Sequence, residues 1–451
     1  MASRTNNVDM VNGSLWGKIL KFSAFYMMTA ILQHLYSAAD VIVVGRFAGQ
    51  DALAGVGTCT VLVNLFLNFF LGLSAGATIV LGQAIGAKNK DEIGKVVHTS
   101  IAVAIYGGAI VTVVCLLFTK QLLHMIDVPE SVMPEAADYL RFISIGYIPS
   151  LIYNFGAAIL RAKGDTKRAM YIVAVSGIIN VALNLFFVCV LKMKASGVAL
   201  ATVSSQVFTA VVILALLRRE PDETKVSLRK IRIYKQPLIK ILKFGVPSGI
   251  QSSVYSISNI LVQSGVNSFG SAAIAGSAAT TSITDFYIVM LNSLYQASMV
   301  FVSQNFGAKK FERIKKIMGI CAIYVLCLWV LQVFITLFCG QFLIGLYTQD
   351  LSVAEWAWRK LRLIGSCYGI LGFMNVMSGT LRGMGASIFN MITSIIGVCG
   401  IRVLWLLTVF PAIGTYESLW VSYPLSWTGT LFLHFIMFLV LFRKETRGKQ
   451  L

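Results

Sequence analysis

The hexapeptide QAIGAK, Gln83–Lys88, returns as QNFGAK, Gln304–Lys309, in the second half of this 451-residue chain. The two copies are 221 residues apart (304 − 83 = 221), and other matches keep the same spacing. LRFISIGY, which starts at Leu140, is answered by LRLIGSCY, which starts at Leu361. Because chance matches do not keep a constant offset, the chain is predicted to be an internal duplication.

Hydrophobic residues make up 57% of the chain and charged residues only 13%, with a mean hydropathy of +0.77. This composition is more apolar than that of soluble globular proteins. Apolar runs as long as a membrane-spanning helix, about 20 residues, recur throughout, for example at 102–118 and 317–339. They lack the alternation of polar and apolar residues that is typical of membrane β-barrels. The sequence therefore predicts a helical protein that crosses the membrane many times.

The formal net charge of +19 raises the question of a nucleic-acid partner. The Lys and Arg residues instead gather in alternate loops, which is typical of the cytoplasmic loops of membrane proteins. These basic loops lie at 88–95, 161–168, 218–243, 309–316 and 443–449. This distribution predicts contact with the lipid bilayer and no binding of nucleic acid. The eight cysteines form no CxxC pair, so neither a metal site nor a disulfide scaffold is indicated.

Hydropathy and turn signals predict twelve membrane spans, six in each repeat. They run near 15–40, 52–81, 95–118, 138–160, 169–191, 196–217, 239–265, 274–303, 314–338, 359–381, 389–410 and 417–441. We expect an all-α fold with an N-terminal lobe at 1–217, a basic cytoplasmic linker at 218–238 and a C-terminal lobe at 239–451. With six spans each, the two bundles have the same orientation and are related by a pseudo-two-fold axis along the membrane normal. Both chain ends are then cytoplasmic.

The first span carries a polar face that ends in a carboxylate. Gln33, Tyr36 and Ser37 precede Asp40 by seven, four and three residues, so the four side chains share one helical face. An ionisable side chain within a span costs roughly 2.5–3.5 kcal/mol, which makes it a functional candidate by default. Asp40 is therefore predicted to be the cation-coupling residue and a reversible proton carrier. The alternative is that Asp40 marks the membrane boundary, because GRFAGQD follows it within about two turns.

Neutral polar residues in later spans are candidates for lining the same pocket. Asn180 and Asn184 lie four residues apart in the fifth span and share one helical face. Thr202 lies in the sixth span and Asn154 in the fourth. The alternative for each of them is a structural role as a bridge between helices.

The second repeat does not duplicate this set of residues. At the offset of 221, Asp40 aligns with Leu261, so the carboxylate has no counterpart. The second half carries Asp285 and Arg402 instead. Asp285 is a second candidate carrier. Arg402 is either its counter-ion, an anchor for an anionic substrate, or a side chain that extends to the cytoplasmic edge of the membrane.

The paired QAIGAK and QNFGAK loops are not expected to bind nucleotides. The chain has no GxxxxGK[ST] motif and no room for a nucleotide-binding domain. The glycine of each loop is expected to end the preceding helix, and the basic residues to face the cytosol. We therefore expect no cofactor, and an ion gradient is the remaining source of energy.

In these features the chain resembles the multidrug and toxic compound extrusion (MATE) family over essentially its whole length. The resemblance rests on the order and spacing of several motifs. They are DVIVVGRFAGQDALAGVG from Asp40, GLSAGATIVLGQAIGAKN from Gly72, LRAKGDTKRAMY from Leu160, ASGVALATVSSQ from Ala195 and FVSQNFGAKKFERIKK from Phe301. The resemblance implies two six-helix bundles around a V-shaped cleft. It also implies export of an amphipathic organic cation in exchange for protons or sodium ions.

The resemblance further implies residue roles in the N-terminal lobe. Asp40 matches the first-span acid that several bacterial and archaeal members use for cation coupling. The positions that match its pocket are Tyr36, Asn154, Asn180 and Thr202, to which helical spacing adds Gln33 and Asn184.

Two departures from the family pattern bear on the coupling ion and on the branch. Asn184 stands where some members have a second acid, so Asp40 alone can neutralise one proton or one weakly held sodium ion, which favours protons. Tyr255 stands where the NorM-like branch carries a Glu, so the chain is closer to the DinF-like and archaeal pattern.

Together these features predict a secondary antiporter, not an enzyme, in the plasma (inner) membrane of a bacterium. We expect a monomer that acts on small amphipathic substrates. The alternative within transporters is a flippase for lipid-linked oligosaccharides, which needs a more cationic cleft and often more spans. A membrane-embedded transferase needs clustered acids or a His–Asp arrangement, whereas the four histidines here are dispersed. A passive channel needs a filter-like loop that repeats in both halves.

Overall fold

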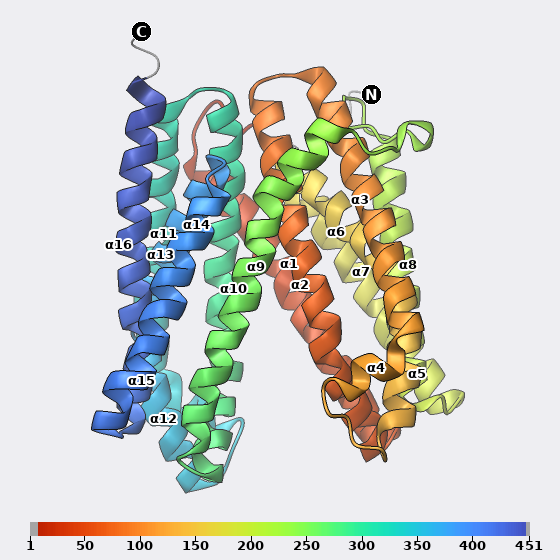
Figure 1. The fold of residues 1–451 in the computed structure, drawn as a ribbon, viewed down its shortest axis with the longest axis vertical. Coiled ribbons are helices and arrows are strands. Elements are labelled where there is room, and N and C mark those ends of the chain that lie inside the picture. The colour runs from red at the N-terminus through yellow and green to blue at the C-terminus, as the bar shows by residue number, and fades with distance from the viewer. Residues whose placement is uncertain (1–7, 448–451) are drawn as a thin grey trace. The chain divides into compact units, whose positions relative to one another are not determined.

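The computed structural model describes residues 8–447, and every regular element in this range is a helix (Figure 1). The first half holds α1 (Trp16–Phe47), α2 (Gln50–Gly86), α3 (Lys90–Leu117), α4 (Thr119–His124), α5 (Met133–Ile145), α6 (Tyr147–Ala162), α7 (Thr166–Asn184), the π-helix η1 (Leu185–Val190) and α8 (Lys194–Arg218). The second half holds the short η2 (Leu228–Lys230), α9 (Lys235–Asn267), α10 (Ser271–Gly307), α11 (Phe311–Gly345), α12 (Leu351–Gly365), α13 (Tyr368–Gly383), α14 (Ser387–Ser394), the π-helix η3 (Ile395–Gly400), α15 (Ile401–Ile413) and α16 (Tyr416–Arg447).

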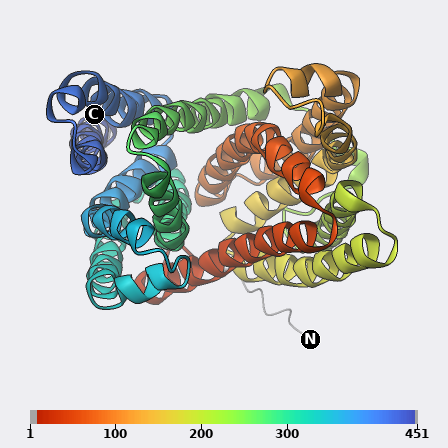
Figure 2. The same ribbon diagram turned by 90° about the horizontal axis from the view of Figure 1, so that it is seen from below.

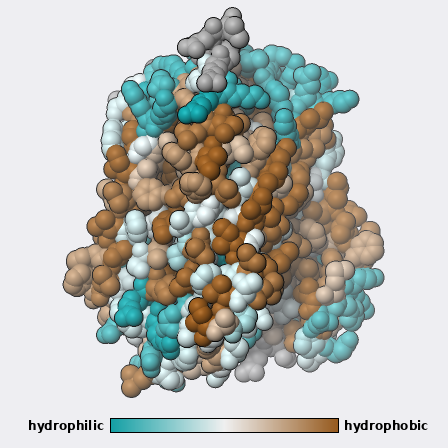
Figure 3. Space-filling view, turned by 60° about the vertical axis from the view of Figure 1, so that its left-hand side comes forward, coloured by the Kyte–Doolittle hydropathy of each residue, from teal (hydrophilic) through white to brown (hydrophobic). Residues whose placement is uncertain are grey.

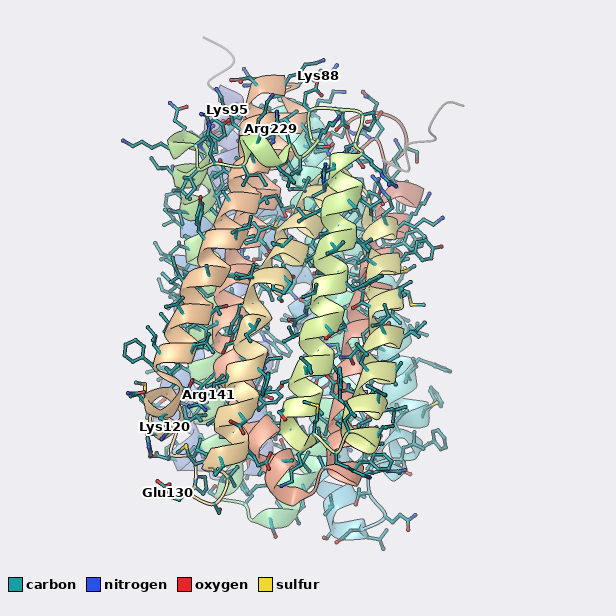
Figure 4. The ribbon with its side chains drawn as sticks, turned by 90° about the vertical axis from the view of Figure 1, so that its right-hand side faces the viewer. Lys88, Lys95, Lys120, Glu130, Arg141 and Arg229 are labelled. Carbon is teal, nitrogen blue, oxygen red and sulfur yellow. The ribbon has the colours of Figure 1, made fainter. Side chains whose placement is uncertain are left out.

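Nine helices of the described residues are long and apolar enough to cross a membrane, and two bent helix pairs raise this number to eleven. The remaining long helix is α9, whose central turns are rich in Ser, Gln and Asn. Figure 3 shows an apolar band on the surface, with hydrophilic residues gathered towards the ends. Figure 4 places Lys88, Lys95 and Arg229 at one end of the helices, and Lys120, Glu130 and Arg141 at the other. This pattern fits a membrane crossed many times.

The described residues form two compact units, whose helices are seen end-on in Figure 2. The N-terminal unit is built mainly from Met28–Gly249, and the C-terminal unit from Asp9–Met27 with residues 250 onward. The units differ from the predicted lobes 1–217 and 239–451 because the first parts of α1 and α9 are exchanged. The segment expected as a linker, 218–238, packs within the N-terminal unit.

A close contact of glycines explains why the start of α9 belongs to the N-terminal unit. Gly72 and Gly76 on α2 meet Gly245 and Gly249 on α9, each pair in a GxxxG pattern. A Cβ added at Gly72 would lie 2.6 Å from the Gly249 nitrogen, and one at Gly76 would lie 2.5 Å from the Ile241 carbonyl oxygen. Small residues in this pattern let membrane helices approach closely.

Replacing Gly76 by alanine is expected to push α9 away from α2 and destabilise the N-terminal unit. Overpacking of this kind costs about 1–3 kcal/mol, and thermal unfolding followed by circular dichroism in detergent measures it. Gly57→Ala is the matched control on the same helix, because a Cβ at Gly57 meets no atom within 4 Å. Equal unfolding temperatures for the two variants would contradict the contact.

The reciprocal exchange places the start of α1 against α10 in the C-terminal unit. The rings of Phe22 and Phe301 meet edge to face with 5.7 Å between their centroids. The Gln296 side-chain amide donates a hydrogen bond of 2.9 Å to the Tyr26 hydroxyl. Both units are therefore completed by the first turns of a helix whose remainder belongs to the other unit.

The hexapeptide loops have the same backbone geometry in both repeats. α2 ends at Gly86 and α10 at Gly307, so the glycine ends each helix as expected. The left-handed residue, however, is the lysine two positions later, with φ of 55° at Lys88 and 56° at Lys309. Two pairs of glycines 221 residues apart also have positive φ, at positions 49 and 270 and at positions 164 and 385. The duplication therefore extends to the turns.

Two predicted spans, 138–160 and 359–381, are bent in the structure. α5 and α6 meet at an angle of 45° and α12 and α13 at 46°. The breaks fall at Gly146 and at Ser366–Cys367, inside the repeated motifs LRFISIGY and LRLIGSCY. In the first repeat Pro149 follows the break, and proline cannot donate its backbone hydrogen bond.

The segment after α8 is held to the N-terminal unit by a buried ionic cluster. Lys163 forms ion pairs with Glu220 and with Asp222, at 2.8 Å in the second case, and its ammonium donates to the Thr224 hydroxyl at 2.9 Å. Arg168 forms a second ion pair with Glu220 at 2.6 Å. Because Lys163 and Glu220 are both buried, this cluster anchors the start of the segment rather than leaving it loose.

Candidate functional site

A chain of hydrogen bonds connects Asp40 to three polar residues of the N-terminal unit. The Asn184 amide nitrogen donates to an Asp40 carboxylate oxygen, and also to the Asn180 side-chain oxygen at 3.2 Å. The Asn180 amide nitrogen in turn donates to the Thr202 hydroxyl at 3.4 Å. Thr202 also lies close enough to Asp40 for the two side chains to interact. The structure thus brings together residues of the first, fifth and sixth predicted spans.

Helical spacing and a local irregularity position these side chains. Asn180 and Asn184 lie one turn apart on α7, and both are buried. Asn184 is the last residue of α7, directly before the π-helix η1. Single π-turns inside helices are frequent at functional sites. Thr202, on α8, donates its hydroxyl hydrogen to the Val198 carbonyl at 3.0 Å, which leaves its oxygen lone pairs for the site.

The partners of Asp40 are neutral. Among the described residues, Asp40 interacts with the amide and hydroxyl groups of Asn184 and Thr202, and no cationic side chain contributes. One amide oxygen, Asn184 Oδ1, is buried without a hydrogen-bond partner. A carboxylate among neutral dipoles keeps its full charge, which is costly in an apolar environment. The arrangement therefore favours a group that gains and loses a cation.

The other predicted pocket residues of the N-terminal unit are not part of this chain. The Tyr36 hydroxyl donates to the Ala174 carbonyl on α7 at 3.1 Å, so it joins α1 to α7 beside the site. The Asn154 amide donates to the Ser150 carbonyl of its own helix at 2.9 Å. Gln33 and Ser37 are exposed.

Gly177 lets the Tyr36 ring lie directly against α7. A Cβ added at Gly177 would fall 1.7 Å from the ring. Gly177→Ala is therefore expected to displace Tyr36 and to reduce transport at least about threefold, with an overpacking cost of about 1–3 kcal/mol. Transport into vesicles and unfolding temperature check the two effects. Gly57→Ala again serves as the control, and unchanged transport by the Gly177 variant would contradict a role for Tyr36.

In the C-terminal unit, Arg402 and Asp285 do not form the predicted ion pair. Arg402 donates to the Asn259 side-chain oxygen at 3.0 Å and to the Ser426 hydroxyl at 3.3 Å. Its exposure is only 3%, so the interpretation that it extends to the membrane edge is wrong. Asp285 is exposed and interacts electrostatically with Lys360.

Sequence reasoning did not single out Lys360, which falls inside the predicted span 359–381. Lys360 lies within α12, is 5% exposed, and donates to the Ser277 hydroxyl at 3.0 Å. A signal was present, because the offset of 221 aligns Lys360 with Tyr139, which is also buried. Arg382 is a second residue that sequence reasoning did not single out. It is buried and donates to the Gln251 side-chain oxygen at 2.7 Å.

Gln251 connects Arg382 to Tyr255, the position on which the sequence-based branch prediction rests. The Gln251 amide nitrogen donates to the Tyr255 hydroxyl at 2.9 Å. The Asn390 amide nitrogen donates to the same Gln251 oxygen as Arg382, at 3.1 Å. In the C-terminal unit a basic and hydroxyl-rich network thus takes the place of an acid.

A polytopic helical fold with an unneutralised carboxylate in a polar site is typical of an ion-coupled membrane transporter. The family model described as MatE matches the chain twice, at residues 26–186 and 247–406. The chain therefore belongs to the MatE family. The two matches begin 221 residues apart (247 − 26 = 221), which confirms the duplication.

Known proteins align with the chain over nearly its whole length. "Probable multidrug resistance protein YoeA" of Bacillus subtilis is 28% identical over 446 residues, with 96% of this chain and 95% of that protein covered. The "FAD transporter" of Shewanella oneidensis is 21% identical over 388 residues and covers 84% of each chain. A solved outward-facing multidrug resistance MATE family transporter of the MOP superfamily has a TM-score of 0.89 at 21% identity, covering 98% of this chain and 99% of that one. These comparisons confirm the all-α, multi-span fold, and the family is one of transporters rather than enzymes.

Proposed function

We propose that this protein is a secondary antiporter that exports amphipathic organic compounds, mainly cations, in exchange for protons. The observation that supports it most directly is Asp40, held only by neutral partners in the N-terminal unit. Family membership supports the class of activity. The printed names of relatives refer to multidrug resistance and to FAD, so an anionic compound occurs beside drugs among related transporters.

Protonation of Asp40 is the proposed coupling step. The ionised carboxylate needs the hydrogen bond from Asn184, whereas the neutral acid holds a proton of its own and needs it less. Protonation therefore weakens the bond from Asn184 to Asp40 and releases that N–H, while the bond from Asn184 to Asn180 can stay in place. We propose that this rearrangement lets α1 bend and expels substrate from the N-terminal unit.

The hydrogen bonding favours protons over sodium ions. Sodium requires several oxygen atoms that converge on one point, as hard cations generally do. Here an N–H group of Asn184 occupies one Asp40 oxygen, and the Thr202 oxygen accepts a hydrogen bond from the Asn180 amide. Asp40 remains one carboxylate without a second acid beside it, because position 184 is an asparagine. Weak sodium binding at Asp40 is the competing arrangement.

The experiment that separates the two ions is uptake of ethidium into vesicles that contain the purified protein. An imposed proton gradient is expected to drive ethidium exchange, and a sodium gradient of equal size is expected to leave it at the level of protein-free vesicles. Exchange driven by sodium alone would overturn the choice of proton. Absence of exchange with either gradient would overturn antiport of cations.

Further features of the proposal concern placement and branch. We propose a monomer in the plasma (inner) membrane of a bacterium, with both chain ends in the cytoplasm. The basic residues Lys88, Lys95 and Arg229 at one end of the helices support this orientation (Figure 4). Tyr255 in place of an acid supports assignment to the DinF-like and archaeal pattern.

A further inference from the structure

Four aromatic rings form a stripe along α16 in the C-terminal unit. They recur at helical spacing of four, three and four residues, and neighbouring centroids are 5.5–5.8 Å apart. The stripe consists of Tyr416, Trp420, Tyr423 and Trp427. Cations lie over two of these rings, Lys360 at 4.2 Å from the Trp420 centroid and Arg402 at 3.9 Å from the Tyr423 centroid.

Arg402 carries a positive charge that no described acid neutralises. Its partners are the amide oxygen of Asn259, the hydroxyl of Ser426 and the ring of Tyr423. Neutral partners and an aromatic face reduce the cost of burying the cation but leave its net charge in place. Lys360 differs, because Asp285 acts on it electrostatically.

A purely structural role explains the position of Arg382 better than it explains the position of Arg402. Arg382 lies in the last turn of α13, where a cation complements the carbonyl end of the helix. Arg402 instead lies within the continuous helical run 387–413, directly after the π-helix η3, and has no helix end beside it. Asn184 of the Asp40 site also lies next to a π-helix, but directly before η1 rather than after it.

One edge of the Arg402 guanidinium has no strong hydrogen-bond partner. Its Nε atom is buried without a hydrogen-bond partner. The adjacent Nη2 atom has only the 3.3 Å contact with Ser426, which is long for a bond from a charged donor. The Nε and Nη2 edge of arginine is a planar fork that matches two oxygens of a carboxylate or phosphate. Asn259, which accepts from the other amino group, Nη1, is exposed, so the guanidinium lies close to an accessible surface.

We propose that Arg402, together with the ring of Tyr423 beside it, binds the carboxylate or phosphate group of amphipathic aromatic anions, as a second substrate class of the transporter. Arg402 supplies the charged fork, and Tyr423, which is partly exposed, supplies aromatic surface for the body of the ligand. This inference rests on the proposed function in one respect, namely that the protein exports the compound after binding it.

The test compares two flavins that share one ring system and differ in charge. Flavin mononucleotide carries a phosphate, and riboflavin does not. Binding to the purified full-length protein in detergent is measured by flavin fluorescence without any ion gradient. The wild-type protein is expected to bind flavin mononucleotide at least about tenfold more tightly than riboflavin, as loss of a charge-assisted pair implies.

Variants of Arg402 identify the group responsible. Arg402→Gln is expected to weaken flavin mononucleotide binding by about 10- to 100-fold and to leave riboflavin binding unchanged. Arg402→Lys keeps the charge without the fork and is expected to recover part of the affinity. Arg359→Gln is the matched control, since Arg359 is paired with Glu417 at 2.6 Å and is expected to have no effect.

The proposal is overturned if wild-type protein binds no flavin mononucleotide at about 1 mM, if both flavins bind equally, or if Arg402→Gln binds as wild type. Unfolding temperatures of the variants separate loss of the site from loss of the fold, and a folded Arg402→Lys variant without any preference for the phosphate also counts against it. Failure here leaves ethidium exchange through Asp40 intact. Loss of proton-driven ethidium exchange with normal flavin binding would instead overturn only the proposed function.

Discussion

Replacing Asp40 by asparagine is expected to reduce proton-driven ethidium exchange to the level of protein-free vesicles. Asparagine has the size of aspartate but neither carries a charge nor binds a proton at neutral pH. The coupling proposed here needs both states of the group, because Asn184 donates to the ionised carboxylate and is released by the neutral acid. We expect the effect in the rate of exchange. The fold should be retained, because asparagine still forms hydrogen bonds and removes a charge that is costly to place in the membrane.

Asp138→Asn is the matched control for this experiment. Asp138 lies in the same unit and carries a side chain that is 60% exposed, with Arg141 at 3.7 Å. A surface pair of this kind contributes at most about 1 kcal/mol. Its variant is expected to exchange within about twofold of wild type. Near wild-type exchange by Asp40→Asn would remove Asp40 from the mechanism altogether.

Replacing Lys163 by methionine is expected to release the segment after α8 from the N-terminal unit. The substitution leaves Glu220 and Asp222 facing each other without the ammonium group that pairs with both. Breaking a buried ion pair from one side costs about 3–5 kcal/mol, and the remaining pair with Arg168 places this case at the lower end. Trypsin cleavage within residues 218–240, which contain many Lys and Arg residues, should accelerate at least about tenfold.

Lys194→Met controls for the loss of a lysine in an exposed pair, because the Lys194 side chain is 65% exposed and binds Glu135 at 3.0 Å. It is expected to leave cleavage unchanged. Equal cleavage of both variants would show that the buried cluster does not hold the segment.

The same cluster predicts a dependence of stability on pH. Burial acts to raise the pKa of Asp222, but hydrogen bonds from Lys163 and Thr224 outweigh it, so the pKa lies below the usual 3.8. A lowered pKa means that ionised Asp222 stabilises the folded state fully above pH 3.8 and that this contribution is lost as the pH falls through the lowered value. The difference in unfolding temperature between wild type and Asp222→Asn should therefore shrink in that acidic range.

Much of the architecture could be predicted from the sequence because two strong signals carry it. Apolar length identifies spans, and a constant offset identifies repeats, so the helix ends at Gly86 and Gly307 follow from local pattern alone. The same reasoning predicted the polar group in the N-terminal unit, because polar atoms in apolar spans must find hydrogen-bond partners within the protein. This group consists of Asp40, Asn180, Asn184 and Thr202.

Other features depended on distant contacts that pattern does not encode. The bends at Gly146 and Ser366 interrupt runs that hydropathy treats as continuous. The exchange of the first parts of α1 and α9 depends on where glycines of separate helices meet. The environment of Arg402 required knowledge of Asn259, which is 143 residues away along the chain. Charge alone could not separate an ion pair from a buried, unneutralised cation.

The contact between α2 and α9 has a consequence for biosynthesis. Gly76 leaves the ribosome 173 residues before Gly249 (249 − 76 = 173), which at about 5–20 residues per second corresponds to roughly 10–35 s. During this interval the glycine face of α2 has no α9 to cover it. A nascent chain that stops after the first repeat would leave that face open to lipid. The duplication therefore does more than double the number of helices, because each repeat supplies a helical segment that completes the unit built mainly from the other repeat.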